Sequence, residues 1–478
     1  MSEIHPFLAK IHSTDPNATA LIYDGVAATY AQLFEEISAQ SELLQSVPKG
    51  SCVGILGDFD LKSVAFLLAN LNRQNIIAPF ANKNELESKL EAGQIDFLFE
   101  NARLQKLSNS NLTKHEILRT LQKSHANGLV LFSSGSTGKP KAVVHNLDNL
   151  LAPYLAKAHN PTITISVFLP DHIAGIDVLF SVLATGGTLI VPKSRTPQEI
   201  LLNLQNHKVE ILPASPSLLR LLQISEMNAF DLSALKLVVC GSEKMSQALL
   251  ESLQKILPQV RFKLGFGTSE TNAIKTKNLS SDSDFFKFIN AEYKIINGEL
   301  YLKTKTQALG YLNVDNSAFD EDGFFATGDL VEVVRVGGEE FLRILGRSKE
   351  LINVGGEKLL PSEVEGVLLT LPFVKDCLVY GETNAITGQS VAAKIVLNSN
   401  LSDYFGDFGE TPSNLELKRQ IRKLCKDKLA PYKIPTKVEI VQSLALTERF
   451  KKARNLANLS EISPQNSNQN SAKKGENG

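Results

Sequence analysis

The chain of 478 residues contains no tryptophan, three methionines and four cysteines. The cysteines lie far apart and never in C-x-x-C spacing, at Cys52, Cys240, Cys377 and Cys425. Paired cysteines are typical of zinc sites, and dense sets of them are typical of disulfide-stabilised secreted domains. The sequence therefore indicates neither a zinc site nor a disulfide framework, and we expect a reducing compartment.

Neither sign of charge prevails, because 50 Lys and Arg residues stand against 51 Asp and Glu residues. A nucleic-acid-binding protein normally carries a basic stripe, and none is visible. No apolar run approaches the roughly 18 residues that a membrane helix needs. The first residues, MSEIHPFLAK, lack the pattern of a signal peptide. We therefore expect a cytoplasmic protein with no nucleic-acid partner and no integral membrane segment, and the oligomeric state stays open.

Short runs of β character alternate with helical patterns over the first two thirds of the chain. A helical pattern over residues 30–44 separates two such runs, and the pattern then repeats. The expected strands are residues 20–23, 52–56, 189–191, 209–212 and 237–240. Alternation of this kind predicts an α/β fold with parallel strands and crossover helices. A chain of this length, 43% hydrophobic and 21% charged, can bury more than one core.

The pattern changes from about residue 285 to short strands with Gly and Asn turns, such as residues 299–304, which predicts a β subdomain. A compact α+β unit follows, with helices at 363–371 and 414–429 and strands at 377–380 and 391–397. Two S-x-x-E capping boxes, at Ser362 with Glu365 and at Ser413 with Glu416, should open the helices. The polar, low-complexity end should be disordered. We expect three parts: residues 1–348, residues 349–457 and a tail over 458–478.

The most informative stretch, residues 129–145, reads LVLFSSGSTGKPKAVVH. An expected strand over 129–132 leads into a run of hydroxyls, glycines and lysines, and such a run can bind an anion. The residues are Ser133, Ser134, Gly135, Ser136, Thr137, Gly138, Lys139 and Lys141. The alternative is a surface loop between strands. A P-loop is excluded because Ser133 stands where its first glycine should be and Pro140 follows the lysine.

The segment SSGSTGKPKAVVH resembles the phosphate-loop signature of the adenylate-forming superfamily. This superfamily includes acyl-CoA and aryl-CoA ligases, adenylation domains of peptide synthetases and firefly-type luciferases. In it the loop holds the β and γ phosphates of ATP while a carboxylate attacks. The resemblance implies that the loop residues bind ATP and that Thr137 has a catalytic role beside a metal ion.

Two further segments match this family in order. Residues 264–271, LGFGTSET, resemble its aromatic-Gly-x-Thr-Glu element, which implies Phe266 at the adenine ring and Glu270 at Mg²⁺. A carboxylate suits Mg²⁺, which prefers one or two carboxylate oxygens plus substrate phosphates. Residues 238–243, VVCGSE, are similar to the turn that lines the adenine pocket, although alone they would be an ordinary strand-to-helix turn. The implied binding residues are Gly241, Ser242, Glu243, Gly267, Thr268 and Ser269.

The segment FFATGDL, residues 324–330, looks like the one whose aspartate, here Asp329, bonds the ribose hydroxyls. A lone Thr-Gly-Asp is more often only a turn. Its place after the Gly310–Tyr311 pair and before ILGRSKELINVGGEKLLPSEVE, residues 344–365, fixes the interpretation. The latter is similar to the family's domain junction. It implies Arg347 at the ribose and phosphate, Lys349 as the hinge and Gly356 at the thiol tunnel.

The last match is LALTERFKKAR, residues 444–454. There the family has a lysine that bridges the acyl carboxylate and the α-phosphate, and Lys451 occupies its position. Phe450 replaces the usual glycine and Ala445 replaces a proline. Lys452 is adjacent, and lysines this near a C-terminus are normally solvated. Lys451 is therefore the expected catalytic lysine, with a surface lysine as the alternative.

The segment FLPDHIAGID, residues 168–177, resembles the family's acid-pocket motif and makes His172 the candidate gate for the carboxylate. The alternative is a satisfied, partly buried histidine. Ile173 stands where amino-acid-activating relatives carry an aspartate, and a buried ammonium needs a paired charge. An amino-acid substrate is disfavoured unless Asp171 or Asp177 takes that position.

The motif series implies a two-step enzyme with a large domain and a mobile small domain. The leading hypothesis is an ATP-dependent ligase that joins a fatty or aryl acid to CoA, with Mg²⁺ as the metal. The second is an enzyme that transfers the acyl group to the phosphopantetheine of a carrier protein. The third, motivated by Phe450 and Ala445, is an inactive nucleotide-binding homologue. Compact ligases such as o-succinylbenzoate-CoA ligase share the short segment between Glu270 and Asp329, but length alone does not identify the acid.

Overall fold

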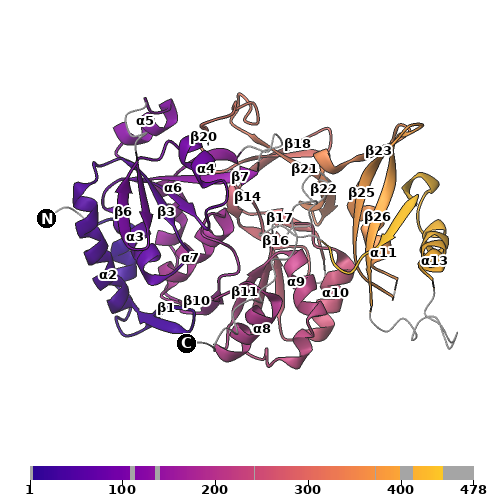
Figure 1. The fold of residues 1–478 in the computed structure, drawn as a ribbon, viewed down its shortest axis with the longest axis horizontal. Helices are drawn as coiled ribbons and strands as arrows, with labels where there is room; N and C mark the ends of the chain where they lie inside the picture. The colour runs from indigo at the N-terminus through magenta and orange to yellow at the C-terminus, as the bar shows by residue number, and fades with distance from the viewer. Residues whose placement is uncertain are drawn as a thin grey trace, which may run out of the picture. The chain divides into compact units, whose positions relative to one another are not determined.

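The computed structural model describes residues 4–107, 113–134, 140–241, 243–281, 283–371, 373–398 and 413–444, without the side chains of Ser134 and Asn414. The chain divides into two compact units, Met1–Leu351 and Ile352–Gly478. Parallel strands, crossover helices and a separate antiparallel sheet are all visible in the ribbon (Figure 1). The predicted mixed α/β fold is therefore confirmed.

One seven-stranded sheet carries the strand that precedes the predicted phosphate loop. Its order is β20-β8-β7-β4-β3-β5-β6, and β3, β4, β5 and β7 run parallel. The strands are β3 (Cys52–Leu56), β4 (Ile76–Phe80), β5 (Phe97–Glu100), β6 (Arg103–Lys106), β7 (Gly128–Ser134), β8 (Pro140–Asn146) and β20 (Gly310–Tyr311). Helix α3 (Leu61–Leu71) crosses from β3 to β4 and is capped by Asp60, which accepts the backbone N–H groups of Lys62 and Ser63.

A second seven-stranded sheet has the order β13-β12-β11-β9-β10-β1-β2. Its strands are β1 (Thr19–Tyr23), β2 (Val26–Thr29), β9 (Ile163–Ile165), β10 (Thr188–Val191), β11 (Ile211–Ala214), β12 (Leu237–Cys240) and β13 (Arg261–Leu264). The connecting helices include α7 (Ile173–Thr185), α8 (Pro197–Asn206), α9 (Pro216–Ile224) and α10 (Gln247–Ile256). Threonine or serine caps with a proline at the first helical position begin α8 and α9, as such sequences favour.

Three details differ from the prediction. The expected strand at 209–212 is shifted to Ile211–Ala214. The strands β1 and β3, which the alternation placed together, lie in different sheets, because β1 pairs in parallel with β10. Sequence reasoning also missed β2, which returns from β1 through Asp24 and Gly25, both with positive φ. An Asp-Gly pair between β-type runs is a strong hairpin signal.

The predicted β subdomain is a six-stranded antiparallel sheet of order β16-β17-β22-β21-β19-β18. Its strands are β16 (Thr276–Asn278), β17 (Phe286–Phe288), β18 (Glu292–Ile296), β19 (Glu299–Lys303), β21 (Phe325–Val336) and β22 (Glu339–Arg347). Leu300, Leu302 and Leu342 are fully buried in its core. A small hairpin of β14 (Phe266–Thr268) and β15 (Asn272–Ile274) precedes it.

The remaining helices of the first unit are α1 (Pro6–His12), α2 (Tyr30–Leu43), α4 (Leu86–Ala92), α5 (Glu116–Lys123) and α6 (Leu147–Leu155). Helix α2 matches the predicted one closely. Among the described residues, no helix is both long and apolar enough to cross a membrane.

The second unit has one sheet and two α-helices in the described residues. Its elements are β23 (Ile352–Val354), β24 (Glu357–Leu359), α11 (Pro361–Leu368), β25 (Val374–Asn384), β26 (Gly388–Leu397), α13 (Asn414–Lys426) and β27 (Lys437–Ile440). Helix α11 packs on β25, and α13 contacts α11 and β27; Val364, Ile395 and Ile421 are fully buried in the shared core.

One of the two predicted capping boxes is correct. Ser413 accepts the N–H of Glu416, and Glu416 accepts the N–H of Ser413, at 3.3 and 2.9 Å. The box predicted at Ser362 and Glu365 is wrong, because α11 begins earlier, at Pro361. Proline presets φ for the first helical residue. Glu365 instead lies within the helix, and its buried carboxylate accepts the N–H of Val379 at 2.9 Å.

Candidate active site

The predicted phosphate loop connects two antiparallel strands. In the register of β7 and β8, Ser133 lies opposite Lys141 and Ser134 opposite Pro140. Both ends of the loop are thus held side by side at the end of a buried hairpin. The predicted residues Gly135, Ser136, Thr137, Gly138 and Lys139 lie outside the described residues.

An asparagine that sequence reasoning missed holds the exit of this loop. The side-chain amide of Asn313 donates to the carbonyl of Pro140 at 2.7 Å, and its oxygen accepts the N–H of Ala142 at 2.9 Å. Leu312 N–H also donates to the carbonyl of Ala142 at 3.0 Å. The first residues after the loop therefore have a fixed path.

Glu270, the predicted metal ligand, is held by Tyr311. The Tyr311 hydroxyl donates to Glu270 Oε1 at 2.9 Å. Burial, together with the charge of Glu270, raises the pKa of Tyr311 well above its ordinary value. The phenol therefore stays protonated and donates. The ammonium of Lys141 lies 5.6 Å from the centre of the Tyr311 ring, which brings a predicted loop lysine to the same place.

The backbone on either side of Glu270 is fixed as well. Ser269 O lies 2.7 Å from Nε2 of His145, which is completely buried on β8. Burial lowers the pKa of His145 to about 4, although backbone hydrogen bonds oppose the shift. Thr304 and Thr306 each donate a hydroxyl to the carbonyl of Thr271 at 3.3 Å. The turn that carries Glu270 is therefore anchored at successive residues.

The residues before Glu270 form a tight hairpin. Thr268 Oγ1 accepts the N–H groups of Glu270 and Thr271 at 3.2 and 3.1 Å. A Cβ atom at Gly267 would meet the carbonyl oxygen of Asn272 at 2.5 Å, so only glycine fits there. The half-buried ring of Phe266 packs edge-on against Phe288, with ring centres 5.6 Å apart. The contact of Phe266 with adenine stays a prediction.

Two glycines lie at the carboxyl ends of the neighbouring parallel strands β12 and β13. Gly241 follows β12, and Gly265 follows β13 and donates its N–H to Cys240 O at 2.6 Å. A Cβ at either glycine would lie 3.4 Å from the other strand's backbone. Ligands of open α/β sheets bind at this edge. Glu243 also has a structural role, because its carboxylate accepts the N–H of Ser217 at the start of α9, 3.1 Å away. Ser242 lies outside the described residues.

Asp329 and Arg347, which the resemblance gave separate roles, form an ion pair. Asp329 Oδ1 lies 2.7 Å from Arg347 Nε, and the two residues face each other across β21 and β22. The Asp329 side chain is 7% exposed and that of Arg347 is 46% exposed. Gly328, which precedes the aspartate within β21, has φ at +73°, a backbone conformation that favours glycine.

His172 caps the helix that follows the acid-pocket motif. Its Nδ1 accepts the N–H of Ala174 at 3.1 Å, and its ring stacks on Phe168 at 5.5 Å. The alternative of a satisfied, buried histidine thus describes its local contacts, and the gating role stays a prediction.

Asp177 lies farther along α7, where its carboxylate accepts the hydroxyl of Tyr154. Burial raises the pKa of Asp177, whereas that hydrogen bond and the charge of Lys157 act in the opposite direction. Lys157 lies 4.7 Å from the centre of the Tyr154 ring and donates to Ser181 at 2.7 Å. Because Asp177 already has these partners, it is a poor candidate for binding a substrate ammonium.

The remaining predicted residues are not brought to this site by the described contacts. Lys349 lies in a short 3₁₀ helix, Ser348–Glu350. Gly356, with φ at +97°, makes the turn between β23 and β24, where its N–H donates to Asn353. Lys451, together with Ala445 and Phe450, lies outside the described residues. The catalytic, hinge and thiol-tunnel roles stay predictions.

The chemistry around Glu270 fits a magnesium ion that is bound mainly through a nucleotide. In the described part of the chain, no group of three or more His, Cys, Asp or Glu side chains could hold a metal by itself. Mg²⁺ is typically held by one or two carboxylates plus substrate phosphates. A single, well-oriented carboxylate beside the predicted phosphate loop meets that requirement.

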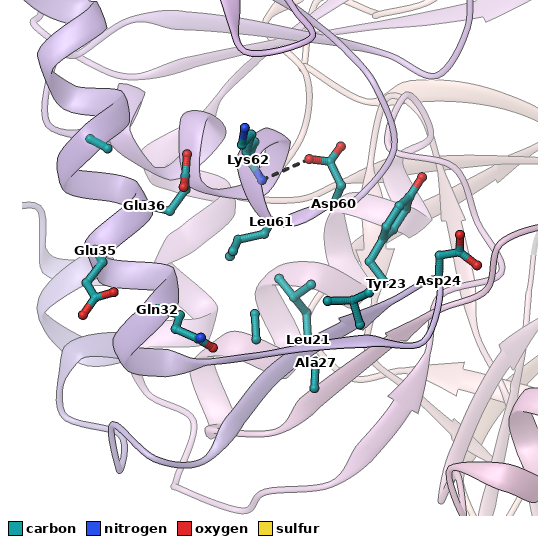
Figure 2. A pocket seen from close by; sticks show the side chains of 13 residues that line it. Leu21, Tyr23, Asp24, Ala27, Gln32, Glu35, Glu36, Asp60, Leu61 and Lys62 are labelled. Carbon is teal, nitrogen blue, oxygen red and sulfur yellow. Dashed lines mark hydrogen bonds between the residues drawn. The ribbon is translucent and has the colours of Figure 1, made fainter.

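A surface hollow of about 840 Å³ lies apart from these residues (Figure 2). Strands β1 and β2 and the helices α2 and α3 form its walls, with Leu21 and Leu61 among its apolar residues and Glu35, Glu36 and Asp60 among its acidic ones. None of the predicted site residues lines it. This hollow is therefore not the predicted nucleotide site.

Comparison with known proteins agrees with the motifs. The family model described as AMP-binding enzyme matches residues 8–312, and the one described as AMP-binding enzyme C-terminal domain matches residues 363–451. The chain therefore belongs to the AMP-binding enzyme family, the adenylate-forming enzymes of the acyl-CoA ligase type. It is by class an AMP-forming acid-thiol ligase.

The similar curated proteins include two bacterial enzymes. The 2-succinylbenzoate–CoA ligase of Listeria innocua is 25% identical, over 94% of this chain and 98% of its own length. That of Bacillus subtilis is 27% identical, over 92% and 94%.

The similar solved structures include an anthranilate CoA ligase, AuaEII, in complex with anthranoyl-AMP. It has a TM-score of 0.78 and 20% identity, and covers 94% of this chain and 95% of its own. The o-succinylbenzoate CoA synthetase of Bacillus subtilis, in complex with OSB-AMP, has a TM-score of 0.71 and 22% identity over 99% of each chain. These structures support the same fold.

Proposed function

We propose that this chain is an ATP-dependent carboxylic acid:CoA ligase that forms an acyl-adenylate and then an acyl thioester. The main support is the nearly complete alignment with the Listeria innocua ligase, which spans 94% of this chain and 98% of the relative. Parts for both half-reactions are therefore to be expected within one chain.

In the first step a carboxylate oxygen of the acid bonds to the α-phosphorus of ATP. The bond from that phosphorus to the bridging oxygen breaks, and pyrophosphate leaves with the electron pair. The protein's task is to position the reactants and to neutralise charge. We assign the phosphates to the loop hydroxyls, Lys139 and Lys141, the ribose to Asp329, and the α-phosphate to Lys451. When bound at Glu270, with Thr137 as a second ligand, Mg²⁺ would offset negative charge on the phosphates.

In the second step the sulfur of CoA bonds to the acyl carbon after losing its proton. The bond from that carbon to the phosphate oxygen breaks, and AMP leaves. Lys451 is not needed in this step. We propose that the small domain turns about Lys349 and presents Gly356 to the pantetheine arm, which would also keep water away from the reactive adenylate.

The acid is proposed to be an aryl acid without an ammonium group. The Listeria innocua and Bacillus subtilis relatives, which match 94% and 92% of this chain, are named for 2-succinylbenzoate. A plant relative that matches 63% of this chain is named 4-coumarate–CoA ligase-like 2. One similar solved structure is an anthranilate CoA ligase. The engagement of Asp177 by Tyr154 further disfavours an amino acid.

Exchange of labelled pyrophosphate into ATP tests the first half-reaction. A panel of 2-succinylbenzoate, 4-coumarate, anthranilate, fatty acids and amino acids should contain an aryl acid that supports exchange. Thioester formation should then require free CoA. Exchange with none of the acids would favour the inactive homologue. Exchange followed by transfer only to a phosphopantetheinylated carrier protein would favour the second hypothesis.

A further inference from the structure

The segment of residues 304–316 contacts both predicted halves of the nucleotide site. Ala308 N–H donates to the carbonyl of Glu270 at 2.6 Å, and Leu309 N–H donates to the carbonyl of Val144 at 2.7 Å. Val144 belongs to β8, the strand that leaves the phosphate loop. The backbone of this segment therefore ties the Glu270 turn to the phosphate-loop hairpin.

Two side chains of the same segment extend these ties to the functional groups. Tyr311, 4% exposed, donates its hydroxyl to Oε1 of Glu270 at 2.9 Å. This hydrogen bond restricts rotation of the Glu270 carboxylate. Because it occupies Oε1, it leaves Oε2 as the oxygen available to another ligand. Asn313 uses both atoms of its amide on the loop exit, at Pro140 and Ala142. Neither role follows from the motif that contains Glu270.

We propose that Tyr311 and Asn313 are positioning residues of the adenylation site. Tyr311 orients the carboxylate that meets the metal ion, and Asn313 fixes the path of the chain that leaves the phosphate loop. This inference rests on the proposed function, because that function brings the metal to Glu270 and the phosphates to the loop. The two side chains lie two residues apart, so one short segment sets the placement of the metal ligand relative to the phosphate-binding residues.

Tyr311→Phe tests the first half of the inference. The substitution removes one hydroxyl that donates to a carboxylate, and hydrogen bonds to charged groups contribute enough to change an affinity about tenfold. We expect about tenfold weaker binding of Mn²⁺ to the ATP complex, measured by electron paramagnetic resonance, with a nearly unchanged melting temperature. Tyr293→Phe is the matched control, because Tyr293 donates to Glu340 at 2.7 Å on the six-stranded sheet. The control should bind Mn²⁺ like the wild type.

Asn313→Ala tests the second half. We expect ATP binding to weaken by about tenfold both with Mn²⁺ and with EDTA, because the defect lies in the phosphate loop. The defect of Tyr311→Phe should instead require the cation. In acid-dependent pyrophosphate exchange, both variants should raise the KM for ATP more than they lower kcat.

Several outcomes would overturn the inference. Wild-type Mn²⁺ affinity in Tyr311→Phe, or the same loss in Tyr293→Phe, contradicts the role of Tyr311. Wild-type ATP affinity in Asn313→Ala contradicts the role of Asn313, and this variant provides the test if Tyr311→Phe does not fold. If the wild-type protein itself binds no Mn²⁺ with ATP, the proposed function fails instead.

Discussion

Asp329 and Arg347 depend on each other in a way that the sequence does not reveal. They belong to two successive motifs, and the antiparallel pairing of β21 and β22 brings Asp329 Oδ1 to 2.7 Å from Arg347 Nε. The aspartate is almost completely buried, so removing its charge leaves the arginine without its partner. The pair can hold the aspartate in one orientation for a ribose.

We expect Asp329→Asn to weaken ATP binding by about tenfold or more, because it loses a charged acceptor for the ribose hydroxyls. Isothermal titration with ATP and with inorganic pyrophosphate measures the effect. Pyrophosphate, which has no ribose, should bind with unchanged affinity. An equal loss for both ligands would contradict the ribose assignment.

His145 provides a prediction about pH at the same scale. Its pKa is about 4 in the folded chain and about 6.5 when unfolded, so the unfolded state binds the proton more tightly. This residue therefore contributes stability above pH 6.5 that is lost as the pH falls toward 4. The loss amounts to about 3 kcal/mol, since one pKa unit corresponds to about 1.4 kcal/mol.

His145→Gln should flatten the dependence of unfolding free energy on pH between 6.5 and 4, measured by urea denaturation. His12→Gln is the control, because His12 is an exposed histidine of α1. Equal slopes for His145→Gln and the wild type would show that His145 is not held neutral.

At the scale of elements, local signals were sufficient where one residue determines the start or end of a structure. The helix at Tyr30 begins with a Thr29–Gln32 capping box, and the Ser413 box begins α13. The signal at Ser362 misled because Pro361 and the tertiary contact of Glu365 with Val379 determined the start of α11 instead. A capping pattern alone does not show at which of two neighbouring residues a helix begins, because packing against a sheet also decides this.

The two serines form a matched pair for measurement. Ser413→Ala should destabilise the second unit by about 1 kcal/mol, because a serine cap contributes that much. Ser362→Ala, inside the helix, should change its stability by less than about half that amount. Urea unfolding followed by circular dichroism measures both. If Ser362→Ala lowered the free energy of unfolding more than Ser413→Ala does, Ser362 would act as the helix cap that the sequence predicted.

Motif order predicted which segments make up the candidate site, and topology supplied contacts between them. The segments around Ser133, Glu270 and Asp329 each carry a recognisable pattern of anion donors, metal ligand or turn. The contacts of His145, Thr304 and Asn313 could not be predicted, because each depends on which strands become neighbours across more than a hundred residues or on the path of an irregular loop. Ordinary side-chain types carry no signal for such contacts.

At the scale of the whole molecule, the proposed two-step reaction requires two domains with different tasks. The family models match the first and the last parts of the chain separately, over residues 8–312 and 363–451.

We expect Lys451→Ala to abolish acid-dependent pyrophosphate exchange while thioester formation from supplied acyl-AMP and CoA stays largely intact. Lys452→Ala is the neighbouring control and should retain both activities. Equal loss of both half-reactions in Lys451→Ala would contradict its assigned role.

In the proposed reaction, this chain activates an organic acid as an adenylate. The most direct measurement is mass spectrometry of the protein-bound products after incubation with ATP, magnesium and a metabolite extract that lacks CoA. We expect an acyl-AMP whose acyl mass corresponds to an aryl acid, together with free pyrophosphate. Intact ATP, or ADP and phosphate without any adenylate, would contradict it.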